Sequence, residues 1–121
     1  MIRVLLVDDH PIMRKGIRSV LESYENIEVI GEASNGLEAV TLANDLTPSV
    51  IIMDVNMPRM DGVQATRLIK QSQPQITIIG LSVNDARSVQ QALLQAGASA
   101  YVNKDHLGED LYQTISSLHA D

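Results

Sequence analysis

The chain has 121 residues, with 15 acidic and 9 basic side chains, a net charge of -6 and 45% hydrophobic residues. This length and composition fit a single globular domain over residues 1–121. The negative charge excludes a basic module that binds nucleic acid, and the absence of cysteine excludes disulfides, thiolate metal sites and cysteine catalysis. No apolar run could span a bilayer or act as a signal peptide, so we expect a cytoplasmic protein with no membrane partner.

Five short hydrophobic runs, rich in β-branched residues and bounded by turn residues, predict strands that are buried on both faces. In chain order they are Ile2–Val7, Ile27–Ala33, Val50–Met53, Ile76–Leu81 and Ala100–Asn103. Between and after them lie segments whose apolar residues recur every three or four positions, which predicts amphipathic helices. These segments cover residues 12–24, 37–46, 63–69, 89–96 and 107–118.

Turn and capping residues mark the ends of the predicted helices. Proline suits a first helical turn, Asn and Asp cap helix N-termini, and glycine ends helices in the left-handed conformation. The N-terminal signals are Pro11, the capping box Asn35-Gly36-Leu37-Glu38, Asp61 and Asp105, and the C-terminal signals are Thr47-Pro48, Gln73-Pro74 and Gly97. Strand and helix thus alternate five times without a hairpin, which predicts an α/β fold with a parallel sheet covered by helices on both faces.

Polar residues follow four of the predicted strands, at the sheet edge where open α/β folds bind ligands. They are Asp8, Asp9, Asp54, Ser82 and Lys104. Each alone could be a helix cap or a solvated loop residue, but their convergence by topology predicts a site. Three neighbouring carboxylates repel one another, and a hard divalent ion such as Mg²⁺ relieves that repulsion. The three histidines show no metal-ligand spacing, so we do not expect zinc.

These groups are the parts needed to accept a phosphoryl group. The Asp54 carboxylate would attack, Mg²⁺ and Lys104 would neutralise charge on the phosphoryl oxygens, and the Ser82 hydroxyl would donate a hydrogen bond to one of them.

At these residues the sequence resembles the receiver domain of two-component response regulators, over essentially the whole chain. Details such as Asp9-His10-Pro11 and Lys104-Asp105 are more similar to the NarL/LuxR-type transcription regulators than to the chemotaxis or OmpR types. The resemblance rests on residues 4–10 (VLLVDDH), 50–62 (VIIMDVNMPRMDG), 78–82 (IIGLS) and 97–104 (GASAYVNK). It implies a flavodoxin-like, doubly wound (βα)5 sheet in the strand order 2-1-3-4-5.

The resemblance also assigns roles at the predicted site. Asp54 is implied to accept a phosphoryl group from a sensor histidine kinase, which makes the domain a regulatory switch with slow self-catalysed chemistry and not an enzyme. Asp8 and Asp9 would hold Mg²⁺ directly or through water, together with Asp54 and the backbone carbonyl of Asn56. Lys104 would bind the phosphate.

Two further residues are implied to carry the switch. Ser82 would be the hydroxyl that moves toward the phosphoryl oxygens, and Tyr101 the aromatic residue whose rotamer reports that movement. Tyr101 is equally well explained as a half-buried strand residue with a solvated hydroxyl. Gly62 would allow a backbone conformation that other residues disfavour.

The resemblance also implies which surfaces could contact a kinase, an output domain or a second copy of the chain. The kinase would contact the first helix at Ile12, Met13 and Gly16, although Ile12 and Met13 also fit a core role. Regulators of this type usually continue into a DNA-binding helix-turn-helix domain, so the chain is either a stand-alone receiver or one excised from a longer protein. A polar outer face could form a homodimer or hold an effector domain; its residues are Arg87, Gln90, Gln91, Gln95, Asp110, Gln113, Thr114 and Ser117.

Two positions depart from the family pattern. Asp105 stands where most receivers have a proline after a cis peptide bond, so the conformation of the Lys104-Asp105 peptide is open. Val83 is larger than the small residue that commonly follows the switch hydroxyl, and it could narrow access to the site.

Three other classes of function fit the sequence less well. A haloacid-dehalogenase-type phosphohydrolase needs a second acid two residues after the nucleophile, where this chain has Asn56. A flavodoxin-like electron carrier lacks its phosphate loop after Val7, and no tryptophan is available for the flavin. A pseudo-receiver that only binds partners would not need the complete acidic site.

Overall fold

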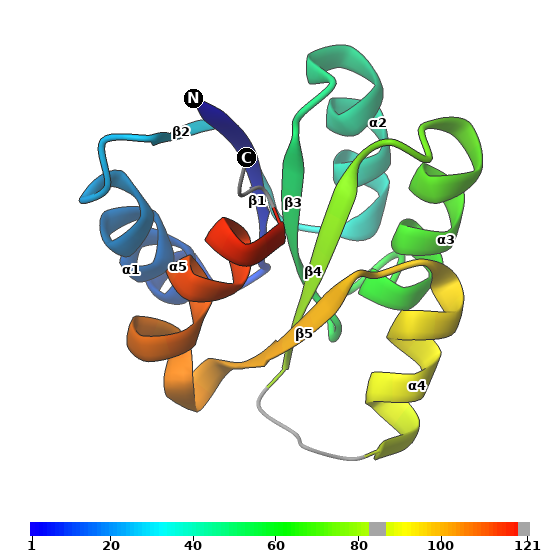
Figure 1. The fold of residues 1–121 in the computed structure, drawn as a ribbon. Coiled ribbons are helices and arrows are strands. Elements are labelled where there is room, and N and C mark those ends of the chain that lie inside the picture. Colours follow the sequence, from blue (N-terminus) through cyan, green and yellow to red (C-terminus); the bar gives the residue numbers. More distant parts are fainter. Residues whose placement is uncertain (83–86, 119–121) are drawn as a thin grey trace.

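The computed structural model describes residues 1–82 and 87–118, so the expectation about Val83 lies outside the described residues. In this part of the chain, strands and helices alternate as the sequence predicts (Figure 1). The strands are β1 (Ile2–Val7), β2 (Ile27–Ala33), β3 (Val50–Asp54), β4 (Thr77–Ser82) and β5 (Ala100–Asn103). The α-helices are α1 (Pro11–Glu22), α2 (Gly36–Leu46), α3 (Gly62–Ser72), α4 (Arg87–Ala96) and α5 (Leu107–Leu118), with a 3-10 turn, η1 (Lys104–His106), before α5.

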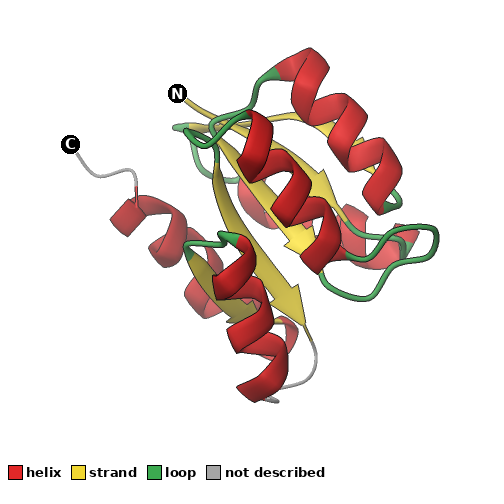
Figure 2. Ribbon diagram, turned by 90° about the vertical axis from the view of Figure 1, so that its right-hand side faces the viewer, coloured by secondary structure: helices red, strands yellow, loops and turns green. Residues whose placement is uncertain are grey.

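The five strands form one parallel sheet in the order β2-β1-β3-β4-β5, which confirms the predicted topology. The sheet is twisted, and helices cover both of its faces (Figure 2). Chain order reverses beside β1, so the carboxyl ends of β1 and β3 lie next to each other. The strands β3 and β4 each reach one residue further than predicted, which makes Asp54 and Ser82 their last residues.

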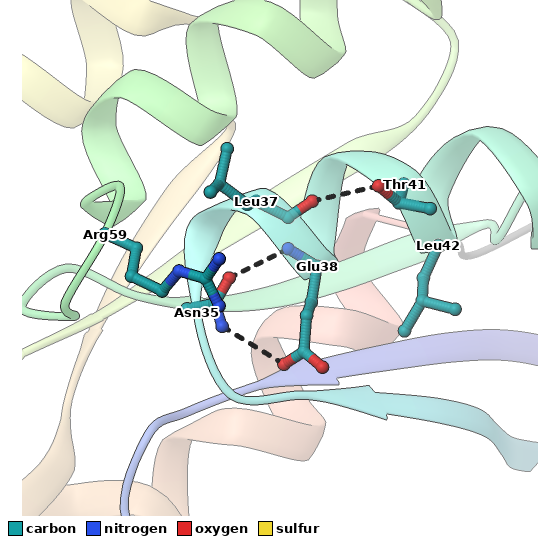
Figure 3. A pocket seen from close by; sticks show the side chains of 6 residues that line it. All are labelled: Asn35, Leu37, Glu38, Thr41, Leu42 and Arg59. Atoms are coloured by element: carbon teal, nitrogen blue, oxygen red, sulfur yellow. Dashed lines mark hydrogen bonds between the residues drawn. The ribbon is translucent and has the colours of Figure 1, made fainter.

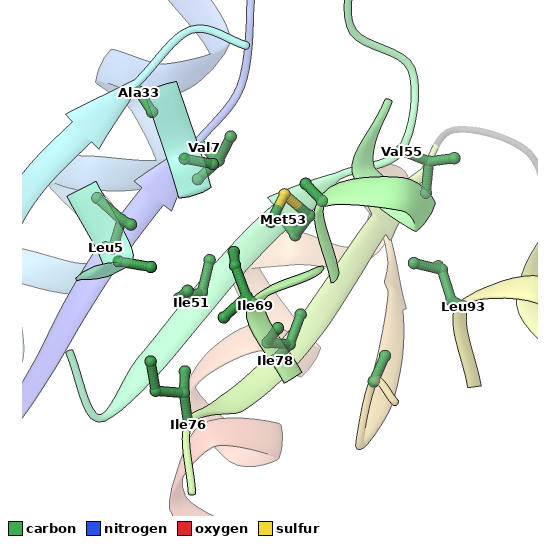
Figure 4. Packing of buried hydrophobic residues seen from close by; sticks show 14 residues of the cluster. Leu5, Val7, Ala33, Ile51, Met53, Val55, Ile69, Ile76, Ile78 and Leu93 are labelled. Atoms are coloured by element: carbon green, nitrogen blue, oxygen red, sulfur yellow. The ribbon is translucent and has the colours of Figure 1, made fainter. Parts of the chain in front are cut away.

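The central strands β1, β3 and β4 bury side chains on both faces of the sheet, because successive residues point in opposite directions. Leu5, Val7, Ile51 and Met53 pack toward α2, α3 and α4 in one core cluster (Figure 4). Their neighbours along the strands pack toward α1 and α5 in a second cluster; these are Val4, Leu6, Val50 and Ile52. The near-continuous hydrophobicity of the strands is therefore explained by burial on both sides.

Most of the predicted helix ends are confirmed. The side chains of Asn35 and Asp61 accept hydrogen bonds from the backbone N–H groups of Glu38 and Gln64, at 2.9 and 2.8 Å. At the other ends, Thr47 and Gly97 adopt φ angles of 45° and 117° after α2 and α4. Pro11 is the first residue of α1.

The prediction that Asp105 caps the last helix is wrong. Asn103 caps the preceding 3-10 turn η1: its side-chain oxygen accepts from the backbone N–H of Asp105 at 2.8 Å. Asp105 consequently lies inside the 3-10 turn that precedes α5. Because Asn and Asp are equally good caps, their spacing alone could not decide between them.

The capping box at α2 extends one residue beyond the predicted segment. Glu38 accepts from the backbone N–H of Ser34 at 2.8 Å, and the amide of Asn35 lies 3.4 Å from the same carboxylate oxygen (Figure 3). The Ser34 hydroxyl also donates to this oxygen, and this bond, followed by the one from the Ser34 backbone N–H, lowers the pKa of Glu38, with help from the positive charge of Arg59. Asn35, Glu38 and Arg59 are among the residues around an open hollow of about 300 Å³, which none of the predicted site residues lines.

Within the described residues, no helix has both the length and the apolar character needed to cross a membrane.

Candidate functional site

Three carboxylates meet where β1 and β3 end. Asp8 and Asp9 follow β1, and Asp54 is the last residue of β3, which pairs in parallel with β1. Asp8 and Asp54 are buried, whereas the Asp9 side chain is 26% exposed. The backbone N–H of His10 donates to Asp8 Oδ1 at 2.8 Å, which fixes the turn between β1 and α1. The structure thus brings together the three acidic residues that the sequence predicts.

Lys104 reaches this cluster from the end of β5. Its Nζ lies 2.8 Å from Asp8 Oδ2 and 3.2 Å from Asp54 Oδ1, and its side chain is only 6% exposed. Burial alone would lower the pKa of Lys104, but the hydrogen bond to Asp8 and the charge of Asp54 outweigh burial and raise it. The ammonium group is therefore charged at neutral pH. The Lys104-Asp105 peptide, whose conformation the sequence left open, is trans.

The environment of Asp54 disfavours its ionised form in the absence of a cation. Burial raises the pKa of Asp54 to about 6, and the charges of Asp8 and Asp9 add to this effect against the opposing charge of Lys104. Asp54 Oδ2 is completely buried and has no hydrogen-bond partner among the described residues. An unpaired, buried carboxylate oxygen destabilises the folded protein unless a cation or a hydrogen-bond donor binds it.

A divalent cation fits this donor set. One ligand atom from each of Asp8, Asp9, His10 and Asp54 can be chosen so that all four lie within 4.8 Å of one another. Carboxylate oxygens are the ligands that Mg²⁺ prefers. Asn56 lies in the loop after β3 with an exposed side chain, and the part of its backbone carbonyl in metal binding stays a prediction.

Ser82 ends β4, the strand next to Asp54, and Tyr101 lies on β5, one strand further out. Leu81 of β4 pairs with Asp54, so buried Ser82 stands one residue further along at the same sheet edge. Tyr101 pairs with Gly80 and is half-buried against the core cluster that α4 covers. The burial of Tyr101 agrees with the alternative that it is a half-buried strand residue. The parts of Ser82 and Tyr101 in switching stay predictions.

The loop after β3 passes very close to the acceptor residue. A Cβ atom at Gly62 would overlap the backbone oxygen of Asp54, and the Gly62 N–H donates to Val55 O at 2.9 Å. Glycine is thus needed here for the close approach of two backbones, and not for the unusual backbone conformation that the sequence suggests. The unusual φ in this loop belongs to Arg59, at 70°.

Two arginines on α1, which no sequence motif singles out, bind Glu32 on β2, and one of them also braces the acidic turn. Arg14 donates from Nη1 to the backbone oxygen of Asp8 at 2.7 Å and from Nε to Glu32 Oε1 at 2.9 Å. Arg18 binds the other oxygen of Glu32. The periodicity of α1 could have placed Arg14 and Arg18 on one helix face, but nothing local to them indicated their partner on β2.

His10 is also part of the site. Its Nδ1 lies 3.0 Å from Asp9 Oδ1 and 3.3 Å from Asp8 Oδ1. The spacing of the histidines from one another gives no indication of this placement. The signal that would have found His10 is its position directly after two acidic residues at a strand end.

The predicted kinase-contact residues lie on the exposed side of α1. Ile12 is 88% exposed, so the alternative that it belongs to the core is wrong. Met13 is half-buried against the second core cluster, as that alternative predicts, and Gly16 is exposed. An apolar hollow of about 380 Å³ lies here; its lining residues are Ile12, Met13, Gly16, Ile17, Val20 and Leu107.

The chain belongs to the response regulator receiver domain family, whose model matches residues 4–116. Among curated proteins, it is 39% identical over 120 residues to the response regulator GacA of Pseudomonas aeruginosa and to the response regulator UvrY of Escherichia coli K12. These matches cover 99% of this chain but 56% and 55% of those proteins. The chain therefore spans about half the length of these relatives.

Solved structures agree with this assignment. A two-component response regulator of the LuxR family from Aurantimonas superposes with a TM-score of 0.93 at 34% identity, covering 98% of this chain and 84% of that chain. The isolated receiver domain of RcsB from Salmonella enterica, studied with the phosphomimetic BeF3-, gives 0.88 at 31% identity, covering 97% and 87%. The resemblance to NarL/LuxR-type regulators is thereby confirmed.

Proposed function

We propose that this chain is a regulatory phospho-acceptor: Asp54 takes a phosphoryl group from a phosphohistidine of a sensor histidine kinase in a Mg²⁺-dependent reaction. The observation that carries the proposal is the pairing of Lys104 Nζ with Asp8 and Asp54, beside the buried and unpartnered Asp54 Oδ2. One buried lysine and one unpartnered carboxylate oxygen are what an incoming phosphoryl group and a cation would use.

The reaction is a substitution at phosphorus. A carboxylate oxygen of Asp54 forms the new phosphorus–oxygen bond as the phosphorus–nitrogen bond to the kinase imidazole breaks, and the imidazole leaves with the bonding electrons. When bound by Asp8, Asp9 and Asp54, Mg²⁺ supplies charge neutralisation for the phosphoryl oxygens and keeps Asp54 ionised. Lys104 lies close enough to Asp54 to pair with an oxygen of the transferred group.

The signal would travel through Ser82 and Tyr101. A hydrogen bond from the Ser82 hydroxyl to the acyl phosphate draws the end of β4 inward, and Tyr101 turns into the space that this movement vacates. Phosphorylation then shifts an equilibrium between two existing conformations by its differential affinity for them. The coupling is typically about 1–3 kcal/mol, which gives a partial shift.

The wider role follows from the relatives. Because the matched regulators are about twice as long as this chain, we propose that a DNA-binding output domain accompanies the receiver in a full regulator and that phosphorylation controls transcription through it. The receiver, residues 1–121, is a single domain that does not itself bind DNA. The kinase contacts the exposed part of α1, and activation promotes a homodimer.

The proposal is tested by labelling with a small phosphodonor, acetyl phosphate or phosphoramidate, followed by intact mass spectrometry. Wild-type protein is expected to gain one phosphate with Mg²⁺ and none in EDTA, and Asp54→Asn is expected to gain none. Asp45→Asn, an exposed aspartate at the far end of α2, is the matched control and should label normally. Labelling of another residue, or labelling that EDTA does not reduce, would overturn the assignment of Asp54.

A further inference from the structure

The imidazole of His10 occupies an unusual place for an exposed histidine. Although its side chain is 68% exposed, Nδ1 lies within hydrogen-bonding or ion-pair distance of two carboxylates, at 3.0 Å from Asp9 Oδ1 and 3.3 Å from Asp8 Oδ1. Its backbone N–H is held to Asp8 Oδ1 at 2.8 Å, so the ring is tethered at the rim of the acidic cluster. The ring nitrogen therefore faces the same space as the carboxylates.

A second observation shows that this space suits a ligand. Asp54, which is 2% exposed, is a member of the cluster, and its buried Oδ2 has no hydrogen-bond partner among the described residues. Ligands of an octahedral ion with bonds of about 2.1 Å lie about 3–4 Å apart. Four donor atoms that already lie within 4.8 Å of one another need only small side-chain rotations to reach that arrangement.

We propose that His10 supplies a nitrogen ligand at this site, so that the receiver binds divalent ions that favour imidazole, such as Co²⁺, more tightly than its carboxylates alone would. This inference rests on the proposed Mg²⁺ site. Mg²⁺ strongly prefers oxygen, so a nitrogen adds little to its binding, whereas affinity for later transition ions rises with imidazole ligands. His10 is thus a residue that determines which metal the site prefers.

A different role for His10 predicts the opposite result. If the imidazole acts only as a positive counter-charge for Asp8 and Asp9, it competes with every cation equally. Removing it would then tighten the binding of Mg²⁺ and Co²⁺ together. Removing a ligand instead weakens Co²⁺ binding while leaving Mg²⁺ binding nearly unchanged. The two roles are therefore separated by the ratio of the two affinities.

The affinities for Mg²⁺ and Co²⁺ are measured by isothermal titration at neutral pH. For His10→Ala we expect Co²⁺ binding to weaken by about tenfold or more, and Mg²⁺ binding to change by less than about threefold. His106→Ala is the matched control, because His106 is an exposed histidine that lies outside the cluster. It should leave both affinities unchanged.

Pulsed electron paramagnetic resonance of the Mn²⁺-loaded protein gives a direct readout. Wild type and His106→Ala should show a ¹⁴N coupling to Mn²⁺ that His10→Ala lacks. Mn²⁺ binding without that coupling, or tighter binding of both ions by His10→Ala, would overturn the role of His10 and leave the carboxylate site standing. Failure of wild type to bind either Mg²⁺ or Mn²⁺ would instead overturn the proposed function.

Discussion

At Gly62, the absence of a side chain lets the acceptor loop run against the backbone of Asp54. A methyl group in Gly62→Ala would overlap the Asp54 backbone oxygen and lie 2.9 Å from its carbonyl carbon, which forces one of the two backbones to move. Overpacking of this kind costs about 1–3 kcal/mol. We expect urea unfolding to show that loss, and Mg²⁺ titration to show weaker binding because Asp54 is displaced.

Gly16→Ala is the control for this prediction. Gly16 is an exposed residue inside α1, and a Cβ there would have no atom within 4 Å. Replacing a helical glycine by alanine gains about 0.5–1 kcal/mol, so the same substitution should have opposite signs at the two glycines. If Gly62→Ala were as stable as wild type, the close approach to Asp54 would not be a real constraint.

The raised pKa of Asp54 predicts that this residue lowers the stability of the folded protein by an amount that depends on pH. Its carboxyl has an ordinary pKa of 3.8, which burial and then the charge of Asp8 raise to about 6 in the folded protein. The folded state thus binds the proton more tightly than the unfolded state, and Asp54 destabilises the fold progressively as pH rises from about 4 to 6. An asparagine side chain does not titrate, so Asp54→Asn should gain stability over wild type across this range.

We expect this gain to reach about 2–3 kcal/mol above pH 6 in EDTA, measured as the difference in free energy of unfolding between the two proteins. Saturating Mg²⁺ should reduce this difference in stability, because the ion stabilises only a folded protein that can bind Mg²⁺. A difference that stays constant between pH 4 and pH 7 in EDTA would mean that Asp54 ionises normally.

At the scale of elements, α1 and β2 are joined to the acidic turn through Arg14. This side chain donates both to the backbone oxygen of Asp8 and to Glu32, so it sets the position of the turn that carries Asp8 and Asp9. For Arg14→Gln we expect weaker Mg²⁺ binding, because a charge-assisted hydrogen bond worth about 1–3 kcal/mol no longer holds the turn. Calorimetric titration with Mg²⁺ measures the effect.

Arg18→Gln separates this effect from a general loss of charge. Arg18 pairs with Glu32 and Glu22 but makes no contact with the turn in the described structure. The Arg18→Gln variant should therefore leave Mg²⁺ affinity nearly unchanged, although it removes the same positive charge as Arg14→Gln. Equal losses in the two variants would show that long-range charge, and not the hydrogen bond to Asp8, supports metal binding.

The sequence was sufficient to predict the elements whose signals are local. The strands β1, β2 and β5 have the predicted bounds, because each is a short, largely apolar run that turn or polar residues follow. The caps at Asn35 and Asp61 were likewise predictable, since a cap involves residues three apart. The choice between Asn103 and Asp105 was not, because both residue types cap equally well.

The carboxylate cluster was predictable because topology brings the strand ends together wherever the sheet is parallel. The reason for Gly62 and the part of Arg14 were not predictable. Each depends on a contact between separate elements: the loop after β3 against the strand end for Gly62, and α1 against β2 for Arg14. Such contacts leave no pattern in either segment alone.

At the scale of the whole molecule, tyrosines pack beside helices on both sides of the sheet. On the side of α1 and α5, Tyr112 stacks on Tyr24 with ring centroids 3.6 Å apart, and its hydroxyl donates to Asn26 at 3.1 Å. This contact ties α5 to the turn between α1 and β2. On the other side, Tyr101 is half-buried next to α4, where Leu94 is 51% exposed. We therefore expect activation to be expressed at α4 and β5, with α5 held in place.

Beryllofluoride, a non-hydrolysable phosphoryl mimic, tests this expectation through amide chemical shifts recorded with Mg²⁺. Besides the changes around Asp54, we expect large shifts over residues 88–95 and at Tyr101, and small ones at Tyr24 and Tyr112. Because a coupling of about 1–3 kcal/mol gives incomplete conversion, the free protein should already sample the active state, and its α4 signals should show exchange broadening. Shifts that stay within the Asp54 pocket, or that are larger at Tyr112 than at Tyr101, would mean that the signal leaves through a different surface.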